Sequence, residues 1–136
     1  MFSLKEPRKA PDHIIQNAKG QLQNILNNVS GVNFIMICST DGFELTTLYK
    51  KNNFNSNKLA AVSSSLHAMV SALMNELQLV GCQSITLDAD NGKAILTSVP
   101  NEQYPMIIVA LAEKDILLGQ LLYALKKSSK EICDFK

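Results

Sequence analysis

The residues with the chemistry for catalysis or metal binding are few and widely separated in this sequence. His13 and His67 are far apart, and no H-E-x-x-H motif or Cys/His cluster accompanies either of them. Ser63 stands one helical turn before His67, but a nucleophilic serine also needs a third orienting group and an oxyanion site, and the sequence offers neither. We therefore expect no catalytic residue, no cofactor and no metal ligand, and a protein that is not an enzyme.

One further motif has the composition of a ligand loop. Residues 88–92 (DADNG) resemble part of a calcium-binding loop, but the glycine comes one position early and Val99 takes the place of the bidentate glutamate. We interpret residues 88–92 as a turn. The sequence also has no glycine-rich phosphate loop, so we do not expect it to bind nucleotide.

The three cysteines and the N-terminal segment indicate a reducing compartment. Cys38, Cys82 and Cys133 are widely spaced, odd in number and form no C-x-x-C pair, so we expect reduced and mostly packed thiols. Residues 1–11 are charged and lack the apolar run of a signal peptide. No apolar stretch approaches the ~20 residues that a membrane-spanning helix needs. These features predict a cytoplasmic protein without membrane insertion.

Length and composition are typical of one folded domain. The chain has 136 residues, of which 46% are apolar and 18% charged, and its net charge is +1. No Lys/Arg block exceeds a pair and Arg8 is the only arginine, which argues against a nucleic-acid partner. We expect a flexible arm at 1–10, a single domain at 11–130 and a tail at 131–136.

The apolar pattern predicts the element order helix, two strands, helix, three strands, helix. Continuous apolar runs at 32–38 and 106–112 favour strands buried on both faces. Asp41-Gly42 indicates a hairpin to a second strand at 43–49, and residues 84–88 and 93–99 indicate another pair. Hairpins of this kind predict an α/β (α+β) domain with a mainly antiparallel five-stranded sheet.

Three helices are expected around this sheet. The first begins at Pro11, and the middle one spans about 56–79 behind an Asn55 or Ser56 cap. Asp115 is expected to cap the last helix, with lysines near its C-terminal end where they suit the helix dipole. These lysines are Lys126, Lys127 and Lys130.

The middle helix carries two stripes at helical spacing. We expect the bulky stripe to face the sheet, because a sheet is covered by large side chains. The second stripe is small and uncharged, so it allows close approach of another helix. We interpret it as a contact with a second chain; the alternatives are packing under a loop of the same chain, or a solvated face. The bulky stripe is Leu59, Val62, Leu66, Met69, Leu73, Leu77 and Val80, and the small stripe is Ala61, Ser65, Ala68 and Ala72.

The strand at 84–88 is a second candidate contact. It has neither lysine nor proline, the residues that commonly block pairing at a sheet edge. If it lies at the edge, it is open to pairing with another chain. Its residues are Ser84, Ile85, Thr86, Leu87 and Asp88.

Taken together, the sequence resembles the roadblock/dynein-light-chain domain family over about residues 12–128. The resemblance rests on GVNFIMICSTDGFELTTL (31–48), the long small-residue helix and ILLGQLLYALKK (116–127). It implies a profilin-like fold with sheet order 2-1-5-4-3, the middle helix on one face and two helices on the other. It also implies a homodimer in which the middle helices pair and the third strands join, which places both candidate contacts at the dimer interface.

The resemblance also implies a function. Bacterial members of the family often regulate or scaffold a small Ras-like GTPase, so a non-catalytic homodimeric regulator of this kind is the leading expectation. An arginine finger would have to come from Arg8 in the expected arm, so activation would rely on reshaping the loops of the GTPase itself. The alternative is a structural adaptor in a motor, pilus or signalling complex without a GTPase. A ligand-sensing domain is a third hypothesis, but it needs a wide cavity in the core, and the apolar strands predict a filled one.

Overall fold

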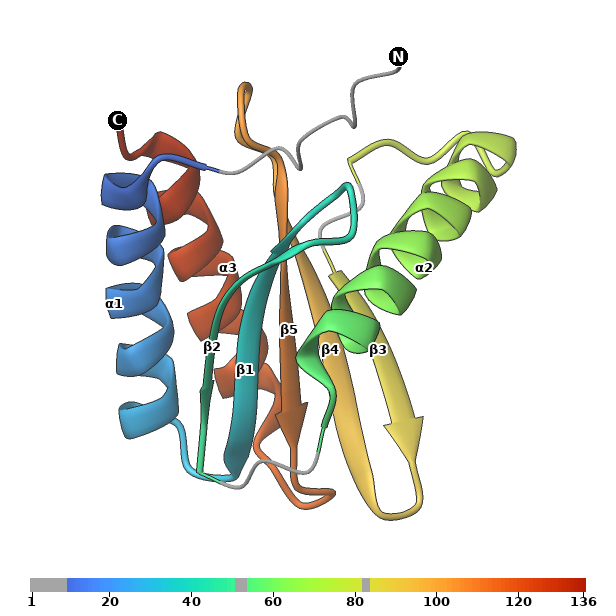
Figure 1. The fold of residues 1–136 in the computed structure, drawn as a ribbon. Coiled ribbons are helices and arrows are strands. Elements are labelled where there is room, and N and C mark those ends of the chain that lie inside the picture. The colour runs from blue at the N-terminus through green and yellow to red at the C-terminus, as the bar shows by residue number, and fades with distance from the viewer. Residues whose placement is uncertain (1–9, 51–53, 82–83) are drawn as a thin grey trace.

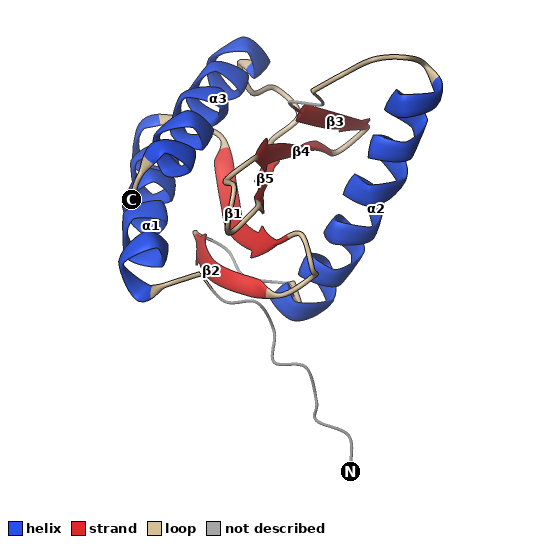
Figure 2. Cartoon of the chain, turned by 90° about the horizontal axis from the view of Figure 1, so that it is seen from above, coloured by secondary structure: helices blue, strands red, loops and turns tan. Residues whose placement is uncertain are grey.

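The computed structural model describes residues 10–50, 54–81 and 84–136 and contains one five-stranded antiparallel sheet. The strand order is β2-β1-β5-β4-β3. Helices α1 and α3 lie side by side on one face, and α2 lies alone on the other (Figures 1 and 2). The predicted fold is thus confirmed. The elements are α1 (Asp12–Asn28), β1 (Val32–Ser39), β2 (Glu44–Tyr49), α2 (Ser56–Glu76), β3 (Ser84–Ala89), β4 (Gly92–Val99), β5 (Met106–Ala112) and α3 (Leu118–Asp134).

The central strands are buried on both faces, as their continuous apolar runs predict. Along β1, Phe34 and Met36 pack toward α2, while Ile35 and Ile37 pack toward α1 and α3. Because each side of β1 is covered, no polar alternation is needed. The expected N-terminal arm lies outside the described residues except for Ala10, which is buried at the start of the core.

The hairpin between β1 and β2 forms at Asp41-Gly42, as expected. Gly42 has a φ of +95°, a conformation that glycine adopts without strain. A Cβ on Gly42 would approach the Cα of Ala61 to 3.4 Å. The Ser64 hydroxyl donates a hydrogen bond of 2.9 Å to the Thr40 carbonyl. The turn therefore touches the N-terminal half of α2 directly.

The face of α2 that packs on the sheet differs from the prediction. Of the bulky stripe, only Leu59 and Leu66 are half-buried, and the others point into solvent. Ala60 and Ser63 are the residues of α2 that are buried. Small side chains let the helix backbone come close to the sheet, so the assumption that bulk must cover a sheet is wrong here. The exposed members are Val62, Met69, Leu73, Leu77 and Val80.

Helix α3 also departs from its predicted bounds. It begins at Leu118 behind Leu117, so Asp115 is not its cap. It continues to Asp134, and Ile132 in its last turns is fully buried. The boundary expected at residue 130 therefore falls inside the helix, and the three lysines lie along its middle rather than in its last turn.

This longer α3 can be tested by mutation. We expect Ile132→Ala to lower the free energy of unfolding by about 2–4 kcal/mol, because it opens a cavity in the core. The neighbouring exposed Glu131→Ala should change it by less than about 0.5 kcal/mol. Urea unfolding followed by circular dichroism measures both. Equal, small effects of the two substitutions would mean that the end of α3 does not belong to the core.

Candidate protein-interaction site

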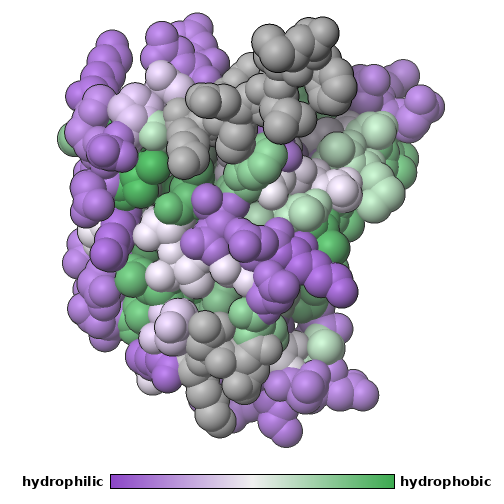
Figure 3. Space-filling model, in the orientation of Figure 1, coloured by the Kyte–Doolittle hydropathy of each residue, from purple (hydrophilic) through white to green (hydrophobic). Residues whose placement is uncertain are grey.

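The side of α2 that faces away from the sheet is an exposed apolar surface, called here the α2 outer face. No residue from Leu59 to Asn75 is charged at neutral pH. Val62, Met69 and Leu73 are 57%, 63% and 56% exposed. In Figure 3, hydrophobic side chains gather over α2 at the right of the molecule. The α2 outer face consists of Ala61, Val62, Ser65, Ala68, Met69, Ala72, Leu73 and Leu77, all exposed.

The small and the large residues of this face form two adjacent rows along the helix. The predicted small stripe (Ala61, Ser65, Ala68, Ala72) runs along it, and Val62, Met69 and Leu73 lie one position further on. Each large side chain therefore projects beside the row of small residues, which forms a shallow groove along the helix. In helix packing, ridges of large side chains on one helix fit into grooves on the other, and this surface offers both. Its exposed apolar side chains follow one another along one side of the helix, as in a contact surface, and are not scattered singly.

Strand β3 is the sheet edge next to this face, as the predicted strand order requires. It pairs only with β4, and every residue of the strand except the half-buried Ile85 is exposed. The Cα register pairs Ile85 with Leu96 and Leu87 with Ala94. Among the described residues no strand pairs with the outer edge of β3. Its backbone N–H and C=O groups on that side remain available to another strand.

Both features lie on the same side of the molecule. In two views at right angles, α2 and β3 are both to the right of the remaining strands (Figures 1 and 2). Leu111 packs on the α2 side of the sheet, and the register links it through Ala94 to Leu87 of β3. The exposed Leu87 therefore lies on the same face of the sheet as α2. The structure thus brings the two sequence-predicted contact segments together. Their role in a dimer interface remains a prediction.

Helix α2 is held to the sheet by two polar contacts beneath this face. Besides the Ser64–Thr40 bond, His67 Nε2 and the Ser98 Oγ of β4 are 2.9 Å apart. Burial lowers the pKa of His67, which favours the neutral ring in this hydrogen bond. These contacts hold the inner side of α2 to the rest of the molecule and involve no residue of the α2 outer face.

The other residues considered for chemistry have structural surroundings. Ser63 is buried and His67 bonds to Ser98 rather than to it. The predicted turn falls at Asp90 and Asn91, between the ends of β3 and β4, and Asp88 is paired with Lys93 at 2.7 Å. Across the described ranges, no three His, Cys, Asp or Glu side chains gather as a metal site would need, and no helix is long and apolar enough to cross a membrane.

The described cysteines are protonated thiols at neutral pH. Burial raises the pKa of Cys38 to about 12. Burial and the nearby Asp134 carboxylate raise the pKa of Cys133. Cys38 and Cys133 are free thiols in the structure, and Cys82 lies outside the described residues.

Comparison with known proteins places the fold. The family model of the Roadblock/LC7 domain matches residues 19–118. The structure is similar to the gliding protein MglB of Thermus thermophilus, with a TM-score of 0.82, 14% identity and 96% of each chain covered. It is similar to Myxococcus xanthus MglB, with a TM-score of 0.82, 12% identity and 93% and 92% of the two chains covered. A further structure, described as MglB with tetrameric arrangement, gives a TM-score of 0.82 at 14% identity and covers 96% of this chain and 95% of its own. A search of curated protein sequences finds no significant match.

The contact between His67 and Ser98 predicts a pH dependence. The pKa of His67 is lowered in the folded state, so as the pH falls through about 6.5 the unfolded chain takes up a proton that the folded chain does not. We expect the free energy of unfolding to decrease over this range, until the pH passes the folded-state pKa. His67→Gln should remove that part of the decrease. Urea titrations at about pH 7.5 and about pH 5.5 measure it, and an equal pH dependence in both proteins would contradict it.

Proposed function

The chain belongs to the Roadblock/LC7 domain family, and on that premise we propose that it is a non-catalytic, homodimeric regulator or scaffold of a small Ras-like GTPase in the cytoplasm. The observation that carries the proposal is the α2 outer face beside the open edge of β3. A single chain leaves both surfaces uncovered. A second copy of the same chain offers a matching pair.

The α2 outer face suits pairing with its own copy. In a two-fold contact the same patch meets itself, so the groove of one helix receives the large side chains of the other. The small residues allow helix axes to approach to about 8–10 Å. Val62, Met69 and Leu73 are 57%, 63% and 56% exposed, so their burial would contribute about 1–2 kcal/mol for each side chain. Self-association is further supported by the tetrameric arrangement described for one MglB structure.

Strand β3 would extend the same contact. In the two-fold arrangement β3 meets the β3 of the second copy, and the two sheets become one. Asp88 is neutralised by Lys93 of its own chain, so it does not place an unpaired negative charge at this edge. We place Ser84 to Asp88 at the dimer contact together with Ala61, Ser65, Ala68 and Ala72.

Membership of the family supports a regulatory role, and the arginine content bears on how that role would be carried out. Arg8 is the only arginine and lies outside the described residues, so the described surface supplies no guanidinium to a transition state. We propose that the dimer acts by binding and reshaping the loops of the GTPase. The alternative is an adaptor that uses the same dimer to hold together a motor, pilus or signalling complex without a GTPase.

The dimer is tested by placing a charge on the α2 outer face. We expect the wild-type chain to elute at twice 14.9 kDa in size-exclusion chromatography with light scattering, and Ala68→Glu to elute as a folded monomer. The control is Gln120→Glu, which adds the same charge on exposed α3. A dimer that survives Ala68→Glu would place the contact elsewhere, and a wild-type monomer at micromolar concentration would exclude the homodimer.

The GTPase partner is tested by capture. The immobilised chain is presented with Ras-like GTPases of its own organism, loaded with GDP or with a non-hydrolysable GTP analogue. We expect preferential capture of one nucleotide state by about tenfold, which corresponds to about 1.4 kcal/mol of coupling. Equal retention of both states, or none of either, would favour the adaptor.

A further inference from the structure

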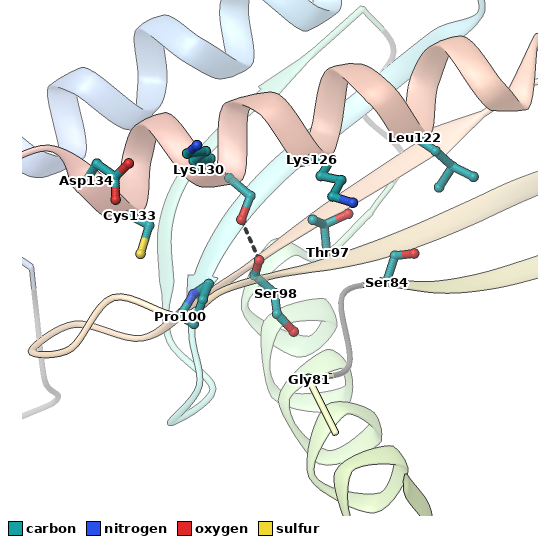
Figure 4. Close-up of a pocket in the computed structure, with 11 residues that line it drawn as sticks. Gly81, Ser84, Thr97, Ser98, Pro100, Leu122, Lys126, Lys130, Cys133 and Asp134 are labelled. Atoms are coloured by element: carbon teal, nitrogen blue, oxygen red, sulfur yellow. Dashed lines mark hydrogen bonds between the residues drawn. The ribbon is translucent and has the colours of Figure 1, made fainter. Parts of the chain in front are cut away.

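A cavity of about 560 Å³ opens on the other face of the sheet, between α3 and the β3–β4 edge. Figure 4 shows side chains of α3, among them Leu122 and Lys126, above the strands, with Thr97 of β4 and Ser84 of β3 below them. This face is opposite to the one that α2 covers. The cavity is thus separate from the α2 outer face, and it lies beside the core rather than inside it.

The cavity exists because short hydroxyl side chains leave the space between β4 and α3 unfilled. On the same face of β4, Ile95 and Val99 are fully buried within the core of α1 and α3. Between them stands Thr97, and its partner across the register is Ser84. Opposite these, α3 presents Ser129. Three short side chains leave a volume that lies within the range of small-molecule sites, about 300–1,000 Å³.

Thr97 is the strongest sign of a ligand. Its side chain is 4% exposed, and its Oγ1 has no hydrogen-bond partner among the described residues. Ser129 beside it is satisfied, because its hydroxyl donates a bond of 2.6 Å to the Ser98 carbonyl (Figure 4). A buried hydroxyl without a partner loses its hydrogen bonds to water and gains none in return, which destabilises the fold. Less than 1 Å² of this oxygen is accessible, so a ligand atom accepts a hydrogen bond from it, and offsets that cost, only once a neighbouring side chain moves aside.

The charges around the cavity favour an anion. Lys126 and Lys130 line it one helical turn apart, and Asp134 lies a further turn along at the far end. Lys126 of α3 and Thr97 of β4 both line this cavity (Figure 4). Lys126 is exposed and makes no ion pair with a described residue, so it can move aside to admit a ligand. Leu122, Pro100 and Cys133 supply apolar walls.

We propose that this cavity binds a small amphipathic carboxylate. Its anionic group lies between the Lys126 ammonium and the Thr97 hydroxyl, and its apolar body lies against Leu122 and Pro100. The carboxylate accepts a hydrogen bond from Thr97 Oγ1 and takes a charge-assisted one from Lys126. Lys130 adds a second positive charge at the rim.

Octanoate is the probe for the test, because it joins a carboxylate to a flexible apolar chain. Two-dimensional amide NMR of the full chain is recorded while octanoate is added up to about 10 mM. We expect saturable shifts at Ser84, Thr97 and Lys126. Lys126→Gln should weaken binding by about tenfold, and Lys127→Gln, one residue away but outside the cavity, should leave it unchanged. Thr97→Val should weaken binding, and Thr97→Ser should retain it.

Two further ligands separate the contributions. Octan-1-ol has the apolar chain without the charge, and inorganic phosphate has charge without the chain, so both should bind more weakly than octanoate by about tenfold. The proposal is overturned if no shift appears at the cavity residues, or if the shifts centre on Met69 and Leu73 of the α2 outer face. It is equally overturned if phosphate binds as tightly as octanoate, or if Lys127→Gln weakens binding as much as Lys126→Gln.

Discussion

The close packing of α2 on the sheet is the constraint on which the rest of this molecule depends. Ala60 and Ser63 are buried against the strands, and Gly42 of the neighbouring hairpin, which has a positive φ, lies close to the backbone of Ala61. The fully buried positions of the helix are small, and Leu59 and Leu66 are the large residues that pack against the cluster beneath it, so most of the other large residues lie outward. The helix is therefore held tightly by its own sheet while its greater apolar surface stays uncovered.

The two faces of the sheet serve different purposes as a result. The face under α1 and α3 is filled by large aliphatic side chains and supplies most of the core. The face under α2 holds a smaller cluster around Phe34, Met36 and Ile107. Self-association is proposed on the α2 side and along the edge of β3, and ligand binding on the other face, so the two proposed surfaces meet at Ser84, which borders both.

Much of this fold is readable from the sequence, and the exceptions have physical causes. The runs at β1 and β5 and the Asp41-Gly42 turn identify their elements, because burial on both faces and a positive φ each leave a clear mark. The inward side of α2 is not readable, since hydrophobicity does not tell whether a side chain is buried by its own chain or by another. The end of α3 is hidden because Ser128 and Ser129, both buried, interrupt its apolar pattern. The cavity at Thr97 has no recognisable sequence motif, because it forms where side chains are short and not where a particular residue pattern occurs.

The exposed leucine, valine and methionine side chains of α2 also affect how prone the chain is to aggregate while it is still a monomer. A newly made protomer presents this surface to the whole cell, so its freedom from aggregation depends on how quickly it meets another protomer. If the dimer forms as proposed, the stability of the fold rises with its own abundance. Synthesis from neighbouring ribosomes on one messenger would shorten the search, and chains left in excess would be the ones that proteases and chaperones remove.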